Sequence, residues 1–309
     1  MSMRKQVLFV FFFCLFLNCK FEKEQNTDLE KTLRITCTTG IIADLVKNIV
    51  GSEAQVTALM GPGVDPHLYK ATQGDLKKLN RADIIIYNGL HLEGKMGELF
   101  EKLKNRKTVM AAADGIPNSN LINTTDFQGA YDPHIWFDVS LWMMVGEYLT
   151  DQLAEQPQLN GKEIRKNSEL YLKELNQLHQ WVQEKIDLLP PDQSVLITAH
   201  DAFGYFGRAY GIQVKGLQGI STLSEYGLKD ISDLVNFIVD RKIKAVFVES
   251  SVSDRALNAV VEGCRSKGHE IEIGGSLFSD ALGAEGTAEG TYLGMVKHNV
   301  TTIVENLNN

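Results

Sequence analysis

Residues 160–189 have the sequence NGKEIRKNSELYLKELNQLHQWVQEKIDLL, and this stretch decides how the rest of the chain divides. It contains no Gly after Gly161, and the next Pro is Pro190. This composition and the spacing of its apolar side chains predict one amphipathic helix of about 25 to 30 residues, or roughly 40 Å. The apolar side chains that recur every three or four residues are Tyr171, Leu175, Leu178, Val182, Ile186 and Leu189.

Strand-like and helix-like segments alternate on both sides of this helix. Repeated alternation of this kind predicts parallel sheets covered by helices. We therefore expect an α/β fold with two lobes, each a mainly parallel sheet flanked by helices, joined by the long, rigid helix. The short apolar runs that predict strands are residues 33–39, 55–60, 82–88, 108–111, 194–199, 212–214, 245–248 and 270–273, and helical patterns cover residues 41–50, 230–241 and 256–267 and begin again at Val139.

The first residues predict export from the cytoplasm. Arg4 and Lys5 precede an apolar run over residues 7–17, which is too short to span a bilayer as a helix. We expect a signal peptide over residues 1–18, with Cys19 as the lipid acceptor of a bacterial lipoprotein. Phe16 and Asn18 depart from the common lipoprotein pattern, so plain cleavage and an uncleaved anchor are the alternatives.

The expected domain order follows from these segments. A polar, lipid-anchored tether over residues 19–31 leads into an N-terminal lobe over residues 32–159. The linking helix over residues 160–189 and a C-terminal lobe over residues 190–309 complete the chain. A lipid on Cys19 would hold the protein at a membrane surface, in the periplasm or at the cell surface.

Composition excludes some classes of partner and site. The 309 residues carry a formal charge of −8, which disfavours a nucleic-acid partner. Apart from Cys14 of the leader and the lipid acceptor Cys19, the cysteines are Cys37 and Cys264, which fall in different lobes and predict no disulfide or zinc ribbon.

The tripeptide Asp-Pro-His occurs twice, as residues 65–67 and 132–134, in a chain with only 7 Pro and 7 His. Imidazole is the commonest side-chain ligand of transition metals, and a neighbouring Pro fixes the backbone that aims the ring. Asp65-Pro66 also has the pattern of a helix N-cap followed by Pro, so a helix is expected to begin there. Two such histidines suggest a shared metal ion, although a lone His at a helix start is more often structural.

Two further candidates follow strands of the C-terminal lobe. His200 comes directly after the run at 194–199, and Asp280 follows the run at 270–273 by a short segment. Ligands of parallel sheets gather beyond the carboxyl ends of the strands, so His67 and His134 from one lobe and His200 and Asp280 from the other are expected to meet. Three imidazoles and one carboxylate suit Zn²⁺ or Mn²⁺ rather than Ca²⁺ or Mg²⁺.

Alternative interpretations exist for two of the acidic residues. Asp280 could cap the following turn, since Asp is an ordinary capping residue. Glu249, at the end of the run at 245–248, could accept a hydrogen bond from a ligating histidine or form a structural salt bridge.

Six segments resemble the zinc/manganese solute-binding lipoproteins of bacterial ABC transporters, the TroA-like group of cluster A-I binding proteins. They occur in the family's order and span nearly all of residues 33–305. The segments are GPGVDPH (61–67), ADIIIYNGLHLE (82–93), DPHIW (132–136), TAHDAFGYF (198–206), VES (248–250) and LFSD (277–280).

The resemblance implies metal ligation by His67, His134, His200 and Asp280. It also implies two α/β lobes with modest movement on metal release, a monomer, and delivery of zinc or manganese to a membrane permease. His200 is typical of the zinc-capable branch, whereas the long His/Asp-rich loop of many zinc-specific members is absent between Asn118 and Tyr131.

Two other functions are the alternatives. A His₃Asp zinc site could belong to a metal-dependent hydrolase, but four protein ligands fill a tetrahedron and leave no place for the catalytic water. No His-Glu-x-x-His motif is present, so we expect no enzyme. Surface adhesion is compatible with an exposed lipoprotein, but no sequence feature favours it.

Overall fold

The structure is a computed structural model that describes residues 32–124, 130–190 and 194–308. The expected signal peptide, Cys19 and the whole of the tether lie outside the described residues. Within these ranges, every helix is too short or too polar to cross a membrane.

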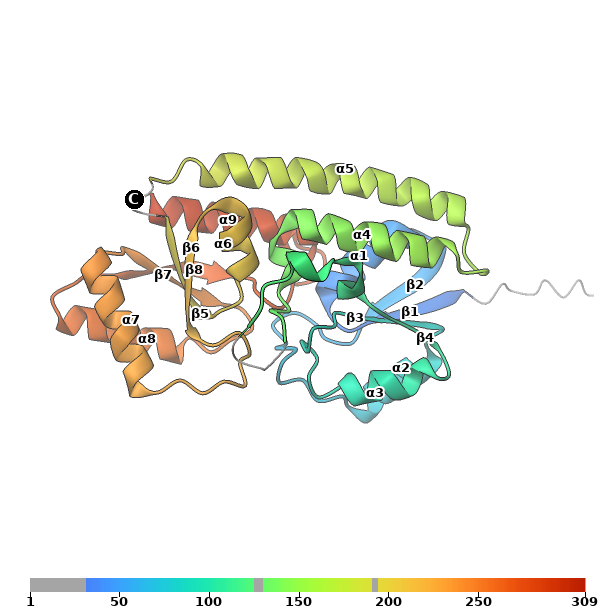
Figure 1. The fold of residues 1–309 in the computed structure, drawn as a ribbon, viewed down its shortest axis with the longest axis horizontal. Helices are drawn as coiled ribbons and strands as arrows, with labels where there is room; N and C mark the ends of the chain where they lie inside the picture. The colour runs from blue at the N-terminus through green and yellow to red at the C-terminus, as the bar shows by residue number, and fades with distance from the viewer. Residues whose placement is uncertain (1–31, 125–129, 191–193, 309) are drawn as a thin grey trace, which may run out of the picture. The chain divides into compact units, whose positions relative to one another are not determined.

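Each lobe is built on a four-stranded parallel sheet (Figure 1). The strand order is the same in both, β2-β1-β3-β4 and β6-β5-β7-β8, so the expected α/β fold with two parallel-sheet lobes is confirmed. The strands are β1 (Leu33–Cys37), β2 (Ala54–Ala58), β3 (Ile84–Tyr87), β4 (Thr108–Ala111), β5 (Val195–His200), β6 (Gln213–Gln218), β7 (Ala245–Glu249) and β8 (Glu272–Leu277).

Helices cover both faces of each sheet (Figure 1). The expected helices at 41–50, 230–241 and 256–267 correspond to α1, α7 and α8. The helices are α1 (Gly40–Val50), α2 (Gln73–Arg81), α3 (Gly97–Lys104), α4 (Val139–Ala154), α5 (Gly161–Ile186), α6 (Gly204–Tyr210), α7 (Leu228–Arg241), α8 (Arg255–Ser266) and α9 (Tyr292–Leu307).

Alternation along the buried strands divides each lobe into two cores. In β3, Ile84 and Ile86 join the large core under α1 and α4, whereas Ile85 joins the smaller core under α2 and α3. Because both faces of the strand are buried, the sequence is continuously apolar rather than alternating.

The long helix α5 links the lobes by packing on both. It contacts α1 and α4 in the N-terminal lobe and α6 and α9 in the C-terminal lobe (Figure 1). Beneath it, one continuous apolar core contains side chains of both sheets, such as Ile35 of β1 and Phe247 of β7. The lobes therefore share a core instead of being joined by a flexible linker.

Strand β8 runs past the predicted end at residue 273 to Leu277. It passes through Gly274 and Gly275, which sequence patterns treat as a loop. A side chain at Gly274 would place its Cβ 2.9 Å from the ring of Phe247 on the neighbouring strand. The close approach of the two strands therefore explains why glycine occupies this strand position.

The expectation that a helix begins at Asp65 is wrong. Residues 66–68 form a single turn, and the next helix, α2, begins at Gln73. Asp65 Oδ1 accepts from the backbone N–H of His67 (2.8 Å) and Leu68 (3.3 Å), which is the N-cap pattern. Helix α2 has its own start signal, because Thr72 supplies its capping box.

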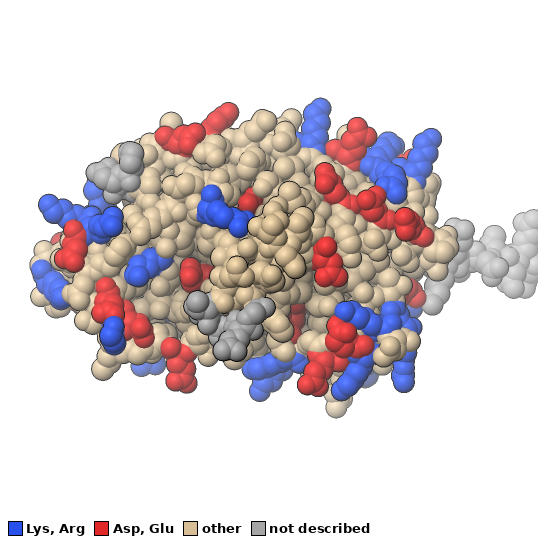
Figure 2. Space-filling view, in the orientation of Figure 1, with Lys and Arg blue, Asp and Glu red and all other residues tan. Residues whose placement is uncertain are grey.

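Charged side chains of both signs are interspersed over the face shown in Figure 2. Exposed ion pairs such as Lys104 with Glu101 (2.7 Å) and Lys229 with Asp233 (2.5 Å) lie on the surface. Pairs of this kind contribute little stability because solvent screens them. The apolar cores therefore dominate the stability of the fold.

Candidate metal centre

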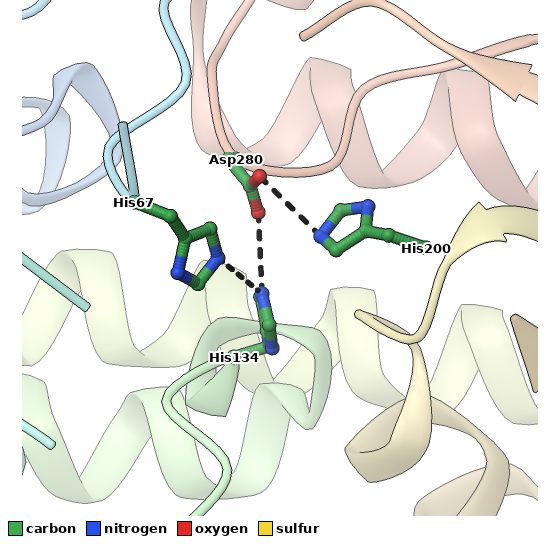
Figure 3. A group of neighbouring side chains, drawn as sticks. All are labelled: His67, His134, His200 and Asp280. Carbon is green, nitrogen blue, oxygen red and sulfur yellow. Dashed lines mark hydrogen bonds and ion pairs between the residues drawn. The ribbon is translucent and has the colours of Figure 1, made fainter. Parts of the chain in front are cut away.

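The structure brings His67, His134, His200 and Asp280 together in one buried cluster (Figure 3). His67 lies in the segment after β2, and His134 directly precedes the 3₁₀ helix η3 (Ile135–Phe137). His200 is the last residue of β5, and Asp280 follows β8. Two side chains thus come from each lobe, as expected from the strand ends.

Distances within the cluster match the spacing of ligands around one ion. His67 Nε2 lies 3.2 Å from His134 Nε2, and the Nε2 atoms of His134 and His200 each lie 3.4 Å from an Asp280 oxygen. A tetrahedral Zn²⁺ with ligands about 2.0–2.1 Å away places ligand atoms roughly 3.3 to 3.4 Å apart. One ligand atom from each residue lies within 4.8 Å of all the others.

The donor set also fits an ion chemically. The four side chains are buried, and the two Asp280 oxygens face the Nε2 atoms of His134 and His200 at 3.4 Å, longer than an ordinary hydrogen bond. Burying a carboxylate is costly unless a cation or hydrogen-bond donors compensate its charge. A divalent cation between the four side chains would satisfy these atoms at once.

Two carboxylates contact the Nδ1 atoms of His134 and His200, on the opposite side of each ring from the Nε2 atom that faces the cluster. Glu249 Oε2 lies 2.5 Å from His200 Nδ1, and its Oε1 accepts from the His200 backbone N–H at 2.8 Å. Asp132 Oδ1 lies 2.7 Å from His134 Nδ1 and accepts from the His134 N–H at 2.9 Å. A carboxylate at Nδ1 leaves Nε2 free to bind a metal.

Asp132 is a residue that the sequence reasoning missed. The signal was present, because Asp132 is the first residue of the second Asp-Pro-His tripeptide. The loop after it is held further by Asn88, whose side-chain amide donates to the carbonyl of Pro133 at 3.0 Å. Buried Glu93 in turn accepts from the Asn88 N–H at 2.7 Å and from Thr38 at 2.6 Å.

The electrostatic environment differs among the three histidines. Burial lowers the pKa of His67 to about 3. Burial also opposes protonation of His134 and His200, but the carboxylates around them outweigh it. Asp132 and Asp280 raise the pKa of His134 to about 9, and Glu249 and Asp280 raise that of His200 well above its usual value.

Asp280 stays ionised in this setting. Burial alone would raise its pKa, but the facing His200 and His134 hold it well below the usual range of a carboxyl group. The cluster therefore contains one carboxylate and one neutral imidazole that are ready to bind a cation. The other two imidazoles must lose a proton first.

Comparison with known proteins gives one consistent result. The family described as zinc-uptake complex component A, periplasmic (ZnuA), matches residues 35–306. The manganese-binding lipoprotein MntA of Bacillus subtilis is 49% identical over 278 residues, 90% of each chain. The metal ABC transporter substrate-binding lipoprotein SloC of Streptococcus mutans is 31% identical over 309 residues, 98% of this chain and 99% of SloC.

A solved structure supports the same relationship. The zinc-binding protein TroA of Treponema pallidum is 47% identical over 270 residues, 87% of each chain. The structure of periplasmic TroA superposes with a TM-score of 0.87, covering 90% of this chain and all of TroA.

Proposed function

The chain belongs to the ZnuA family of periplasmic zinc-uptake components, and we propose that it captures one zinc or manganese ion between its lobes for an ABC permease. Its relatives are named as manganese-binding, zinc-binding and metal ABC transporter substrate-binding proteins. A carrier of this kind binds its cargo and releases it unchanged to a membrane partner.

The observation that carries the proposal is the buried cluster of three imidazoles and one carboxylate. We propose His67, His134, His200 and Asp280 as the ligands, with Glu249 orienting His200. The Asp280 carboxylate faces the Nε2 atoms of His134 and His200, and together with His67 these groups would form a tetrahedral site.

The organisation of the chain is part of this proposal. Residues 32–159 and 190–309 form the two lobes, and residues 160–189 link them. Cys19 carries the lipid that holds a monomer at a membrane surface, in the periplasm or at the cell surface, and residues 19–31 are its tether. The lipoprotein names of MntA and SloC support this placement.

Metal analysis tests the function directly. Protein purified without added metal should contain up to one Zn or Mn per chain, and titration should saturate at one. In competition, Zn²⁺ should displace Mn²⁺, because nitrogen-rich sites follow the Irving–Williams order. A titration in which the protein binds neither Zn²⁺ nor Mn²⁺ would refute the proposal.

Paired substitutions test the ligands. His67→Ala with His134→Ala should abolish stoichiometric binding and leave the far-ultraviolet circular dichroism unchanged. The matched control is His269→Ala with His298→Ala, because these histidines contact backbone carbonyls away from the site. Stoichiometric binding retained by the first pair would overturn the ligand assignment.

A carrier role also separates the protein from a hydrolase. Esterase and peptidase activity should not rise when the protein is loaded with Zn²⁺. Turnover that increases in proportion to bound metal would favour the enzyme instead.

A further inference from the structure

The four cluster residues are not held equally across the boundary between the lobes. Trp136, two residues after His134, donates its indole N–H to the carbonyl of Ser279 at 2.9 Å, directly before Asp280. Tyr205, which follows His200, donates its hydroxyl to the carbonyl of Asp132 at 2.8 Å. These bonds are buried. They fasten the chain segments around His134, His200 and Asp280 to one another.

His67 lies on a segment of a different kind. Between β2 and α2, residues 61–72 form turns and extended chain without a helix or strand. Asp65 organises this segment, because its Oδ1 accepts from the backbone N–H groups of His67 and Leu68. The position of the His67 backbone therefore depends on where the Asp65 carboxylate is held.

The other oxygen of Asp65 reaches the opposite lobe. Thr222 Oγ1 donates to Asp65 Oδ2 at 2.6 Å. The segment that carries Thr222 is itself fixed, because the Gln218 side chain, at the end of β6, donates to the carbonyls of Thr222 and Ser224, both at 2.7 Å. Thr222 thus connects a rigid strand end to the least regular of the ligand-bearing segments.

We propose that Thr222 is a positioning residue for metal capture, acting through Asp65 to hold His67 against the other three ligands. The inference depends on the proposed metal-binding function. It states that the hydrogen bond from Thr222 to Asp65, which joins the two lobes, controls the rate of ion release. When this bond breaks, the Asp65 carboxylate is free to rotate, and His67 moves away with its turn. Because the other three ligands stay fastened, the ion leaves on the His67 side.

Thr222→Val removes the donor and keeps the shape of the side chain. A hydrogen bond to a carboxylate contributes enough that its loss should speed dissociation roughly 10-fold or more. Zinc-loaded protein is mixed with excess 4-(2-pyridylazo)resorcinol in a stopped-flow instrument, at chelator concentrations where the rate no longer depends on chelator. Thr222→Ser keeps the hydroxyl and should dissociate within about 2-fold of the parent rate, since only a methyl group is lost.

A double-mutant cycle shows whether Thr222 acts through Asp65. In an Asp65→Ala background, Thr222→Val should change the dissociation rate little, because the acceptor is already gone. An equal acceleration in both backgrounds would overturn the inference, as would a Thr222→Val rate within about 2-fold of the parent rate. Equal unfolding midpoints of the metal-free variants exclude a general loss of structure.

The stoichiometry separates this inference from the proposed function. If the parent protein and Thr222→Val each bind one Zn²⁺ and release it at the same rate, only the role of Thr222 fails. If the parent protein binds no Zn²⁺, the proposed function fails as well.

Discussion

The aspartates of the two Asp-Pro-His tripeptides accept the same backbone hydrogen bond but differ in the side chain that each contacts. Asp65 and Asp132 each accept a hydrogen bond from the N–H of the histidine two residues later. Asp132 also bonds the His134 ring, whereas the second oxygen of Asp65 meets Thr222 from the other lobe. The difference arises from the group that lies opposite each turn.

The carboxylate behind His200 should matter for affinity. Glu249→Gln keeps the size of the side chain but removes the charge that faces His200 Nδ1 at 2.5 Å. Loss of such a partner typically weakens metal binding about 10- to 100-fold. Competition titration with Zn²⁺ measures this change. The control is Glu262→Gln on the exposed face of α8, and equal affinity of the two variants would contradict the role of Glu249.

Metal binding should release protons. The pKa of His134 is raised to about 9 and that of His200 well above its usual value, so both rings favour the protonated form in the metal-free protein, whereas the lowered pKa of His67 favours the neutral ring. Since a ligating nitrogen must lose its proton, binding at pH 7 should release about two protons per ion. Affinity should therefore rise with pH until both rings are deprotonated.

Calorimetric titration in buffers of different ionisation enthalpy counts the released protons. The His67→Ala variant is an informative comparison, because it removes the ring that is already neutral and should leave the number of released protons unchanged wherever binding is still measurable. A heat of binding that is independent of the buffer would contradict the protonation of His134 and His200.

The four residues that the structure brings together were selected from the sequence because each follows a strand or sits in a repeated tripeptide. Sequence reasoning missed Asp132 as a partner of His134, since an Asp at the start of a turn is normally satisfied by the backbone. Glu249 had two interpretations, and its 2.5 Å contact with His200 favours the first, a carboxylate beside a proposed ligand. That contact depends on a tertiary distance that local patterns do not contain, whereas Asp132 and His134 are only two residues apart.

At the scale of elements, α5 depends on one apolar stripe. Leu175 is fully buried in the core shared by the lobes, whereas Leu170 on the same helix is 60% exposed. Leu175→Ala should lower the free energy of unfolding by about 2–5 kcal/mol, because it leaves a cavity. Leu170→Ala should change it by no more than about 0.5 kcal/mol. Urea unfolding of both variants measures the difference, and similar values would contradict the packing of α5.

The helices were predicted less completely than the strands. Helices α2, α3, α6 and α9 were not predicted from the sequence. Helices α3 and α6 are short, and α2 buries only Asp75 and Leu79 along its length, so an apolar repeat is weak or absent. Helix α9 carries a clear signal in Met295, Val296, Val300, Ile303 and Leu307. That spacing was sufficient to find it.

At the scale of the whole molecule, the shared core limits how the lobes can behave. The sequence predicts two lobes, but it does not show that Leu196 and Phe247 of one sheet join the same core as Ile35 and Ile86 of the other. Contacts between segments so distant in sequence are invisible to periodicity. A shared core favours small displacements of packed elements over wide opening about a hinge, as the resemblance implied.

The shared core also predicts that both lobes unfold together. The three tryptophans, Trp136, Trp142 and Trp181, lie in the expected N-terminal lobe and in α5. Because Trp136 also bonds Ser279, their fluorescence reports on the N-terminal lobe and on its boundary with the C-terminal lobe. Far-ultraviolet circular dichroism reports on the helices of both lobes. Urea unfolding curves from the two signals should therefore coincide. Separate midpoints would show that the lobes unfold independently.

Bound metal sharpens this test, because its proposed ligands come from both lobes. At a free Zn²⁺ concentration about 100 times the dissociation constant, the free energy of unfolding should increase by about 2.7 kcal/mol. Both signals should shift together, since the ion is lost when either lobe unfolds. The His67→Ala/His134→Ala protein should show no shift at the same Zn²⁺ concentration. A shift confined to one signal would mean that the ion is held by a single lobe, contrary to the arrangement of His67, His134, His200 and Asp280.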